Sequence, residues 1–418
     1  MVKTYLAQRR NVEGSTKFPQ ILLFPPLSKG DERGILDFVG DRHCWSNSVE
    51  HSKRKALKDS MTIFDGELGL QFVTHLANHY TVPDLVRLAQ LAADKGFKQI
   101  WVNDNIRYRG QLVVLTAIAA RVPVRLGTAI MVPYFHNPLD MADSFAALSE
   151  LCGNREISIG VARGDLGQSP QHVQALKPIA MVRETVRFIR RALQGEEIRY
   201  AEYPFLQEFY RLNPNGKFRL AFKPQSTFKF YGGGNGPQSL QMCGRIMDGL
   251  ISSGTYIPML KAGRLPGMLA TADRATKDVD PKKRLRKICE LNVSISRDRE
   301  KAINFPKRQV SHSILQWEAL KFTAEEYAKL GVRREQVLHL KEAYASGATV
   351  EEASKFVTER MVKAYYAAGT PEEVRDQIIE LAGEAGRLAY DHVAFAKLGP
   401  DYEEAINLLA NDIMPALT

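Results

Sequence analysis

Eight short apolar segments, each followed by a segment with helical periodicity, constrain the fold of this chain most. Their apolar residues run continuously instead of alternating with polar ones, as in parallel strands that are covered on both faces. The segments are 68–73, 98–104, 124–132, 156–162, 228–234, 249–254, 287–295 and 391–398. Eight strand-then-helix units predict an α/β fold, a closed (β/α)8 TIM barrel, in which no strand is left at an edge. A doubly wound open sheet is the alternative.

The periodic pattern does not cover the whole chain. Residues 1–60 show no sustained period and are poor in side chains that could be buried, so we expect a poorly structured N-terminal extension before a barrel of residues 61–418. Met61 opens the regular part, and we hypothesise that it is the natural start. Two stretches, about 197–227 and 305–366, are too long for simple loops and are expected to be insertions that form a lid or an oligomer contact.

Capping signals place helices in and after the second insertion. Thr-x-x-Glu sequences begin at Thr323, Thr349 and Thr370, and this spacing lets the threonine and glutamate side chains bond reciprocally to backbone amides. Pro371 would occupy the first helical position after Thr370. The second insertion is therefore predicted to be helical. The capping sequence at Thr370 is predicted to begin the helix that precedes the last strand.

Composition narrows the class of function. The 418 residues are 44% hydrophobic, and no apolar stretch approaches the ~18 residues of a membrane span. Four cysteines lie far apart without a metal-ligand spacing, which predicts a reduced, cytoplasmic protein without a metal site. The net charge of +10 favours an anionic ligand. Because the basic run at 280–287 lacks interleaved aromatic residues, nucleic acid is not expected as a partner.

Chemistry in such a barrel is expected at the carboxyl ends of the strands. These ends lack an HxH or comparable metal-binding set, which disfavours a metal-dependent hydrolase. His75, His79 and His136 fall near the ends, but a single histidine there is more often structural than catalytic.

A glycine-rich stretch, "FKFYGGGNGPQ" at 228–238, joins the fifth strand segment to its helix. It lacks the glycine that the Rossmann pattern requires at Ser239, and no Gly-Lys-Ser/Thr follows it. Two interpretations remain open on the residues alone. The loop either binds a phosphate group at the start of the helix, or forms a tight turn that lets the helix pack on its strand.

The segment "RLGTAIMVPYFHNPLDMADSFAALSELCGNREISIGVARGD" resembles the luciferase-like flavin and deazaflavin-dependent oxidoreductases. The resemblance extends through "GLQFV", "WVNDN", "YGGGNGPQSLQMCGRIMDGLI" and "GTPEEVRDQIIELAGEAG", and covers most of 66–254 and 364–398. Within this family the chain is most similar to the deazaflavin-dependent branch that includes methylene-tetrahydromethanopterin reductase.

The resemblance implies a barrel that binds FMN or a deazaflavin coenzyme of the F420 type with the phosphate end at the glycine-rich loop. Asp104 would approach the pyrimidine side of the cofactor ring. Ala129 and Ile130 would be joined by a cis peptide bond that lies against the ring, with the small residue Gly127 before it fitting a backbone pressed against a flat group.

Further site residues follow from the same resemblance. Arg163 and Gly164 would line the cofactor, and Asp165 would be a catalytic acid or polariser with Gln168 nearby; a helix cap or loop anchor is the alternative role for Asp165. Beyond the fifth strand, backbone amides or side chains would bind the cofactor phosphate. The residues concerned are Asn235, Gly236 and Gln238.

One residue departs from the family pattern. Several relatives, especially those that oxidise alcohols, have histidine directly after the aspartate of the second strand, where this chain has Asn105. Asparagine cannot act as a general base near neutral pH, so alcohol oxidation through this residue is not expected. Asn105 can still form a hydrogen bond to a ring carbonyl or to the substrate, and we take it with Asp165 as a candidate catalytic residue.

The resemblance thus predicts an oxidoreductase that transfers hydride between a reduced flavin or deazaflavin and a small organic substrate. An FMN-dependent monooxygenase that uses oxygen is the alternative, and a flavin-binding protein without catalysis is a further one. The aromatic residues of 197–227 suggest either a bulky, partly apolar substrate or an ordinary packed loop. Relatives are commonly dimers, so a homodimer is possible.

Overall fold

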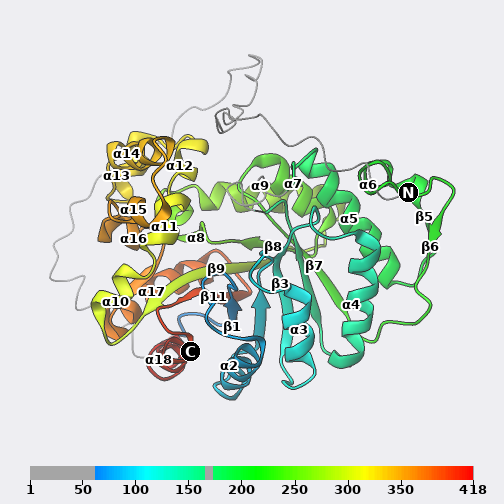
Figure 1. Ribbon diagram of the computed structural model, residues 1–418, viewed down its shortest axis with the longest axis horizontal. Helices are drawn as coiled ribbons and strands as arrows, with labels where there is room; N and C mark the ends of the chain where they lie inside the picture. The colour runs from blue at the N-terminus through cyan, green and yellow to red at the C-terminus, as the bar shows by residue number, and fades with distance from the viewer. Residues whose placement is uncertain (1–61, 165–172, 418) are drawn as a thin grey trace, which may run out of the picture. The chain divides into compact units, whose positions relative to one another are not determined.

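The computed structural model describes residues 62–164 and 173–417, and these contain a closed barrel of eight parallel strands (Figure 1). The barrel strands are β1 (Glu67–Phe72), β2 (Gln99–Val102), β3 (Arg125–Met131), β4 (Ile157–Val161), β7 (Phe228–Gly233), β8 (Gly249–Ser252), β9 (Arg286–Ile295) and β11 (His392–Gly399). Parallel pairing of β11 with β1 and of β8 with β9 closes the sheet. The predicted (β/α)8 barrel is confirmed, and the open-sheet alternative is wrong.

Helices surround the strands, as Figure 1 shows. Those of the barrel are α2 (Val82–Asp94), α3 (Gln111–Ala119), α4 (Pro138–Cys152), α5 (Pro178–Leu193), α7 (Pro237–Ile246), α8 (Tyr256–Lys261), α9 (Leu265–Val279), α17 (Pro371–Arg387) and α18 (Tyr402–Leu408). After α18 the chain continues through the single turns η3 (Leu409–Ile413) and η4 (Met414–Ala416). The local sequence explains these helices. In α2, for example, Thr81 and Asp84 form a capping box, and Leu85, Leu88 and Ala92 share the buried face.

Two apolar cores result from this arrangement. The larger one lies between the strands and the helices. A smaller one fills the inside of the barrel, and its members are Trp101, Ala129, Tyr231, Ile251, Ile288 and Ala394. Within it the rings of Trp101 and Tyr231 meet edge to face, with 5.9 Å between their centroids. The barrel is therefore a packed core, and ligands must bind at one of its ends.

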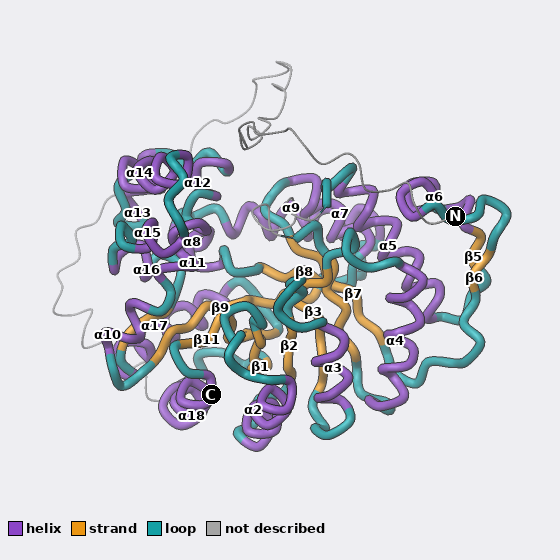
Figure 2. The backbone as a smooth tube through the Cα atoms, viewed as in Figure 1, coloured by secondary structure: helices purple, strands orange, loops and turns teal. Residues whose placement is uncertain are grey.

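Both long insertions contain secondary structure of their own. The first consists of β5 (Ile198–Arg199), η2 (Tyr200–Glu202), α6 (Pro204–Tyr210) and β6 (Lys217–Phe218). The second consists of α10 (Arg299–Asn304), α11 (Lys307–Ser313), α12 (Gln316–Ala319), α13 (Ala324–Lys329), α14 (Arg334–Ala345), α15 (Val350–Ser354) and α16 (Glu359–Lys363). It is followed by β10 (Ala367–Gly369), which pairs with β9 outside the barrel. Figure 2 shows the second insertion as short helices gathered at one side of the barrel.

The capping boxes expected at Thr323, Thr349 and Thr370 are all formed, and Pro371 starts α17. The N-terminal extension and its boundary near residue 60, together with the lid or oligomer role of the insertions, stay predictions.

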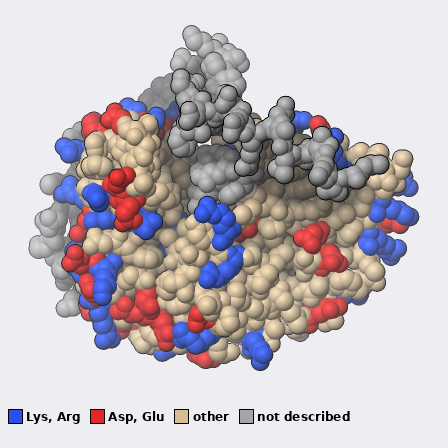
Figure 3. All heavy atoms as spheres, viewed as in Figure 1, with Lys and Arg blue, Asp and Glu red and all other residues tan. Residues whose placement is uncertain are grey.

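Basic and acidic side chains are intermixed over the face drawn in Figure 3. Among the described residues, many basic and acidic side chains form ion pairs; Arg264, for example, bonds to Glu326 with Nε to Oε1 at 2.5 Å. Within residues 62–164 and 173–417, no helix is long and apolar enough to cross a membrane.

Candidate functional site

The carboxyl ends of the barrel strands bring together most of the residues that the sequence singled out. Asp104 and Asn105 lie in the loop after β2, beginning two residues beyond its end, and Ala129 and Ile130 lie in β3. Four more residues follow β4 and β7 in the same way; they are Arg163, Gly164, Asn235 and Gly236. Because all the strands are parallel, these positions share one mouth of the barrel.

The other predicted site residues are not among those that the structure brings together at this mouth. Gln238 lies in the first turn of α7 and is exposed. Asp165 and Gln168 lie outside the described residues, so their predicted roles stay predictions.

The backbone of Ala129 and Ile130 is held from two sides. Their peptide bond is cis, as the family resemblance predicts. Gln71 Nε2 donates from inside the barrel to the Ala129 carbonyl at 2.6 Å. On the other side, the Asp104 amide donates to the Ile130 carbonyl at 3.1 Å. With both carbonyl oxygens bonded, this segment presents a fixed backbone surface at the mouth.

The side chain of Asp104 links the ends of β2 and β3. Its Oδ2 accepts a hydrogen bond from the Val132 amide at 2.9 Å and lies 2.8 Å from His136 Nε2. Burial lowers the pKa of His136, but the hydrogen bond and negative charge of Asp104 raise this pKa by more, so the net shift is upward. Asp104 and His136 thus anchor the loop that follows β3. Contact of Asp104 with a cofactor ring stays a prediction.

The Asp104–His136 pair should make stability depend on pH. A histidine whose pKa is raised on folding contributes stability that is fully present below its unfolded pKa of ~6.5 and is lost as the pH rises through the folded value. We therefore expect His136→Gln to lower the free energy of unfolding more at pH 5.5 than at pH 8.5. Urea unfolding of both proteins at the two pH values measures this, and an equal loss at both would contradict the charged pair.

A second buried carboxyl group is bonded to Gln71. Glu290 of β9 is 5% exposed, and its Oε1 accepts a hydrogen bond from Gln71 Nε2 at 3.0 Å. Burial raises the pKa of Glu290 to about 7, against the opposing effects of the Lys397 charge and of hydrogen bonds from Gly254 and Gln71. Gln71 therefore connects an acid that titrates near neutrality with the carbonyl of Ala129.

The buried Glu290 should destabilise the protein once it ionises. Because its folded pKa lies above the unfolded value, the free energy of unfolding should fall as the pH rises from about 4.5 through about 7. Glu290→Gln removes this dependence, so the variant should gain of the order of 2 kcal/mol on the wild type between pH 5 and pH 8.5. Chemical unfolding at both pH values checks the gain; parallel pH profiles would disprove it.

Asn105 contacts a residue that the sequence did not assign to the site. Its Nδ2 lies 2.8 Å from His75 Nδ1, and His75 Nε2 lies 3.2 Å from Oε1 of Gln309 on α11. The second insertion thereby reaches the mouth of the barrel.

Four glycines lie at the end of β7 and in the loop after it, and their surroundings differ. A side chain at Gly232 would meet the Cys243 sulfur at 2.4 Å, so this glycine lets α7 pack on its strand. Gly234 has a φ of 154°, a backbone conformation that favours glycine. A Cβ added at Gly233 would make only ordinary van der Waals contact with its neighbours. At Gly236, by contrast, φ is −90° and an added Cβ would meet nothing within 4 Å. Packing thus explains Gly232, whereas Gly236 leaves open space at the start of α7.

No side chain caps α7, because Gly236 is its N-cap and Pro237 follows. Pro237 has no N–H to donate. The next backbone amides of the first turn of α7 are not capped either, because Gly236 has no side chain that could accept from them. Open space in front of uncapped amides is the arrangement that an anion requires.

The aromatic residues of the first insertion pack against their surroundings. The Tyr210 hydroxyl lies within hydrogen-bond distance of the carbonyl oxygens of Pro133 and His136 and donates its one proton to this pair, which anchors the loop after β3. Phe209 meets the ring of Tyr134 edge to face, at 5.7 Å between centroids. These contacts match the packed-loop interpretation.

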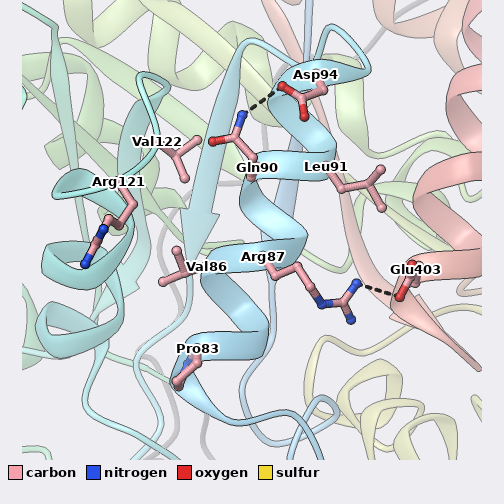
Figure 4. Close-up of a pocket in the computed structure, with 9 residues that line it drawn as sticks. All are labelled: Pro83, Val86, Arg87, Gln90, Leu91, Asp94, Arg121, Val122 and Glu403. Carbon is pink, nitrogen blue, oxygen red and sulfur yellow. Dashed lines mark hydrogen bonds and ion pairs between the residues drawn. The ribbon is translucent and has the colours of Figure 1, made fainter.

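A hollow on the outer surface is distinct from this mouth. It lies along α2, where Arg87 pairs with Glu403 of α18 and Gln90 with Asp94 (Figure 4). None of the strand-end residues described above lines it.

Several residues of the mouth were not assigned from sequence. Gln71 is the single polar side chain of segment 68–73, and Glu290 is the one charged residue of 288–295. Both are recognisable signals, since a strand buried on both faces accepts such a group only where it has a partner. His75 was considered only as an isolated histidine. No local signal links it to Gln309, which is 234 positions away.

Comparison with known proteins gives consistent matches. The family model described as luciferase-like monooxygenase matches residues 68–387. A 5,10-methylenetetrahydromethanopterin reductase of Archaeoglobus fulgidus is 25% identical over 84% of this chain and 99% of its own length. An F420-dependent glucose-6-phosphate dehydrogenase of Nakamurella multipartita is 26% identical over 82% of this chain and 94% of its own. The structure of the coenzyme F420-dependent tetrahydromethanopterin reductase of Methanopyrus kandleri superimposes with a TM-score of 0.63 at 23% identity, covering 84% and 99% of the two chains.

Proposed function

Because the chain belongs to the luciferase-like monooxygenase family, we propose that it is an oxidoreductase that uses a deazaflavin coenzyme of the F420 type. The observation that carries the choice of cofactor is the near full-length similarity to the reductase of Archaeoglobus fulgidus and to the F420-dependent dehydrogenase of Nakamurella multipartita. When bound, the reduced coenzyme supplies a hydride. The positive net charge of the chain favours this coenzyme further, because its oligoglutamate tail is polyanionic.

The residues of the mouth fit such a group. Ala129 and Ile130 offer a flat, doubly anchored backbone against which a ring can lie. The space at Gly236 leaves the start of α7 open to a phosphate group. Arg163 and Gly164 would line the cofactor between these two points.

Asn105 bears on the direction of the reaction. It supplies no general base, so a substrate hydroxyl would have no proton acceptor at this position. We therefore favour reduction of a small organic substrate over oxidation of an alcohol. The side chains of Asn105 and Asp104 then orient the reactants, and a catalytic acid role is assigned to Asp165.

The test is titration of the purified protein with F420, FMN and FAD, followed by anaerobic turnover with the reduced form of whichever cofactor binds. We expect F420 to bind more tightly than FMN, and reduced F420 to be reoxidised by an organic acceptor without oxygen. A requirement for FMN and oxygen would favour the monooxygenase alternative. Binding without turnover would favour a non-catalytic protein, and no binding at all would overturn the proposal.

A further inference from the structure

His75, Asn105 and Gln309 form a hydrogen-bonded row across the mouth of the barrel. The three residues come from the loop after β1, the loop after β2 and helix α11. Asn105 and Gln309 are only 9% and 8% exposed. The two bonds of His75, at 2.8 Å to Asn105 and 3.2 Å to Gln309, use both nitrogens of its ring.

The chemistry of these groups assigns each donor and acceptor. An amide nitrogen can only donate, so the Asn105 Nδ2 must donate to Nδ1 of His75. The neutral imidazole then carries its proton on Nε2 and donates it to Oε1 of Gln309. The amide nitrogen of Gln309 donates in turn to Ser313 Oγ at 2.9 Å, and its carbonyl oxygen faces His75.

This row fixes the orientation of the Asn105 amide. Its nitrogen end is turned to the imidazole, and its carbonyl oxygen to the other side. If the amide were reversed, Oδ1 and the lone pair of His75 Nδ1 would face each other without a proton between them, and a buried polar group without its hydrogen bond is destabilising. A neutral His75 therefore disfavours the reversed amide.

We propose that His75 is a positioning residue that makes Asn105 a hydrogen-bond acceptor toward the bound ligand. The ligand group that faces the Asn105 carbonyl oxygen is then a donor, an N–H or O–H of the cofactor ring or substrate. This differs from the ring carbonyl that the sequence suggested as one possible partner, because two carbonyl oxygens cannot form a hydrogen bond with each other. The inference rests on the proposed function for the identity of the ligand.

The experiment compares four variants by their affinity for F420 and by kcat and KM in the reductase assay. His75→Leu frees the amide to turn and should weaken ligand binding about fivefold, the effect of one neutral hydrogen bond. Asn105→Leu removes the acceptor and should weaken it tenfold or more. In Asn105→Asp, His75 can carry a proton on Nδ1 and donate it to one carboxylate oxygen, which leaves the other oxygen toward the ligand, so affinity should stay within about threefold of the wild type.

The double variant His75→Leu with Asn105→Asp separates positioning from a merely structural role. Aspartate has an oxygen at either end, so its orientation no longer matters, and it should recover most of the affinity that His75→Leu loses. If the double variant is no better than His75→Leu, or if His75→Leu binds like the wild type, the inference is overturned while the proposed function stands. A wild type that binds neither F420 nor FMN would overturn both.

An independent measurement does not need a cofactor. Nitrogen-15 NMR of histidine-labelled protein, with the His75 signals identified by their loss in His75→Leu, reports the tautomer of the neutral ring. We expect the proton on Nε2. A proton on Nδ1 would contradict the row and overturn the inference.

Discussion

Gly236→Asp should leave the fold intact and weaken binding of the phosphate-bearing cofactor tenfold or more. An added Cβ meets nothing within 4 Å, and the φ of −90° suits any residue, so the substitution introduces no clash. Aspartate is also a better N-cap than glycine, so the free energy of unfolding should stay the same or rise by a few tenths of a kcal/mol. The carboxylate would, however, stand where the phosphate is proposed to bind, and like charges repel.

The matched control is Gly236→Ser. Serine caps the same helix without a charge, so the difference between the two variants isolates the electrostatic part. We expect the serine variant to bind the cofactor much more tightly than the aspartate variant, at equal stability in urea. Equal affinities for the two would show that no anion lies at the start of α7.

The barrel could be predicted because its strands are buried on both faces. That burial requires continuous apolar runs, and segments such as 156–162 and 391–398 carry this pattern plainly. The strands that escaped prediction are short: β5 and β6 have two residues each and β10 has three, too few for any period to show. The cap at Thr358 was missed for a related reason. Its partner at the third helical position is Met361, whose sulfur accepts the backbone bond in place of a glutamate.

The parts of the site that could be predicted are those that depend on the backbone, not on contacts between side chains. The cis bond between Ala129 and Ile130 follows from the family resemblance, and the strand-end positions follow from the barrel. Gly127 shows the limit of such reasoning. It was expected to let the backbone approach a flat cofactor ring, but a Cβ there would meet Trp101 at 2.5 Å, so the packing of the barrel interior requires this glycine.

Side-chain partners far apart in the sequence could not be predicted. The bonds of His75 to Gln309 and of Gln71 to Glu290 join residues 234 and 219 positions apart, and they form only when the two parts of the chain meet in the folded barrel. A single sequence shows each residue without its partner. The polar residues within apolar strands indicate that a partner exists, but not which one.

Gly244→Ala should destabilise the protein by about 3 kcal/mol, although alanine is the better helix former. Gly244 lies on α7 where this helix crosses α9. A Cβ at Gly244 would stand 2.2 Å from the Ala272 carbonyl oxygen and 3.0 Å from the Thr276 amide nitrogen. Both are backbone atoms of a helix, so they cannot move aside as a side chain could. The two helices must separate instead, which opens a packed core.

The control lies on the other helix of the same pair. Gly267 of α9 has nothing within 4 Å of an added Cβ, so Gly267→Ala should be neutral or stabilise by up to ~1 kcal/mol through helix propensity alone. Urea unfolding of both variants measures the contrast, and equal stabilities would show that α7 and α9 can separate at little cost. Because α7 begins at the loop of Asn235 and Gly236, its displacement by Gly244→Ala should also weaken cofactor binding, whereas Gly267→Ala should leave binding unchanged.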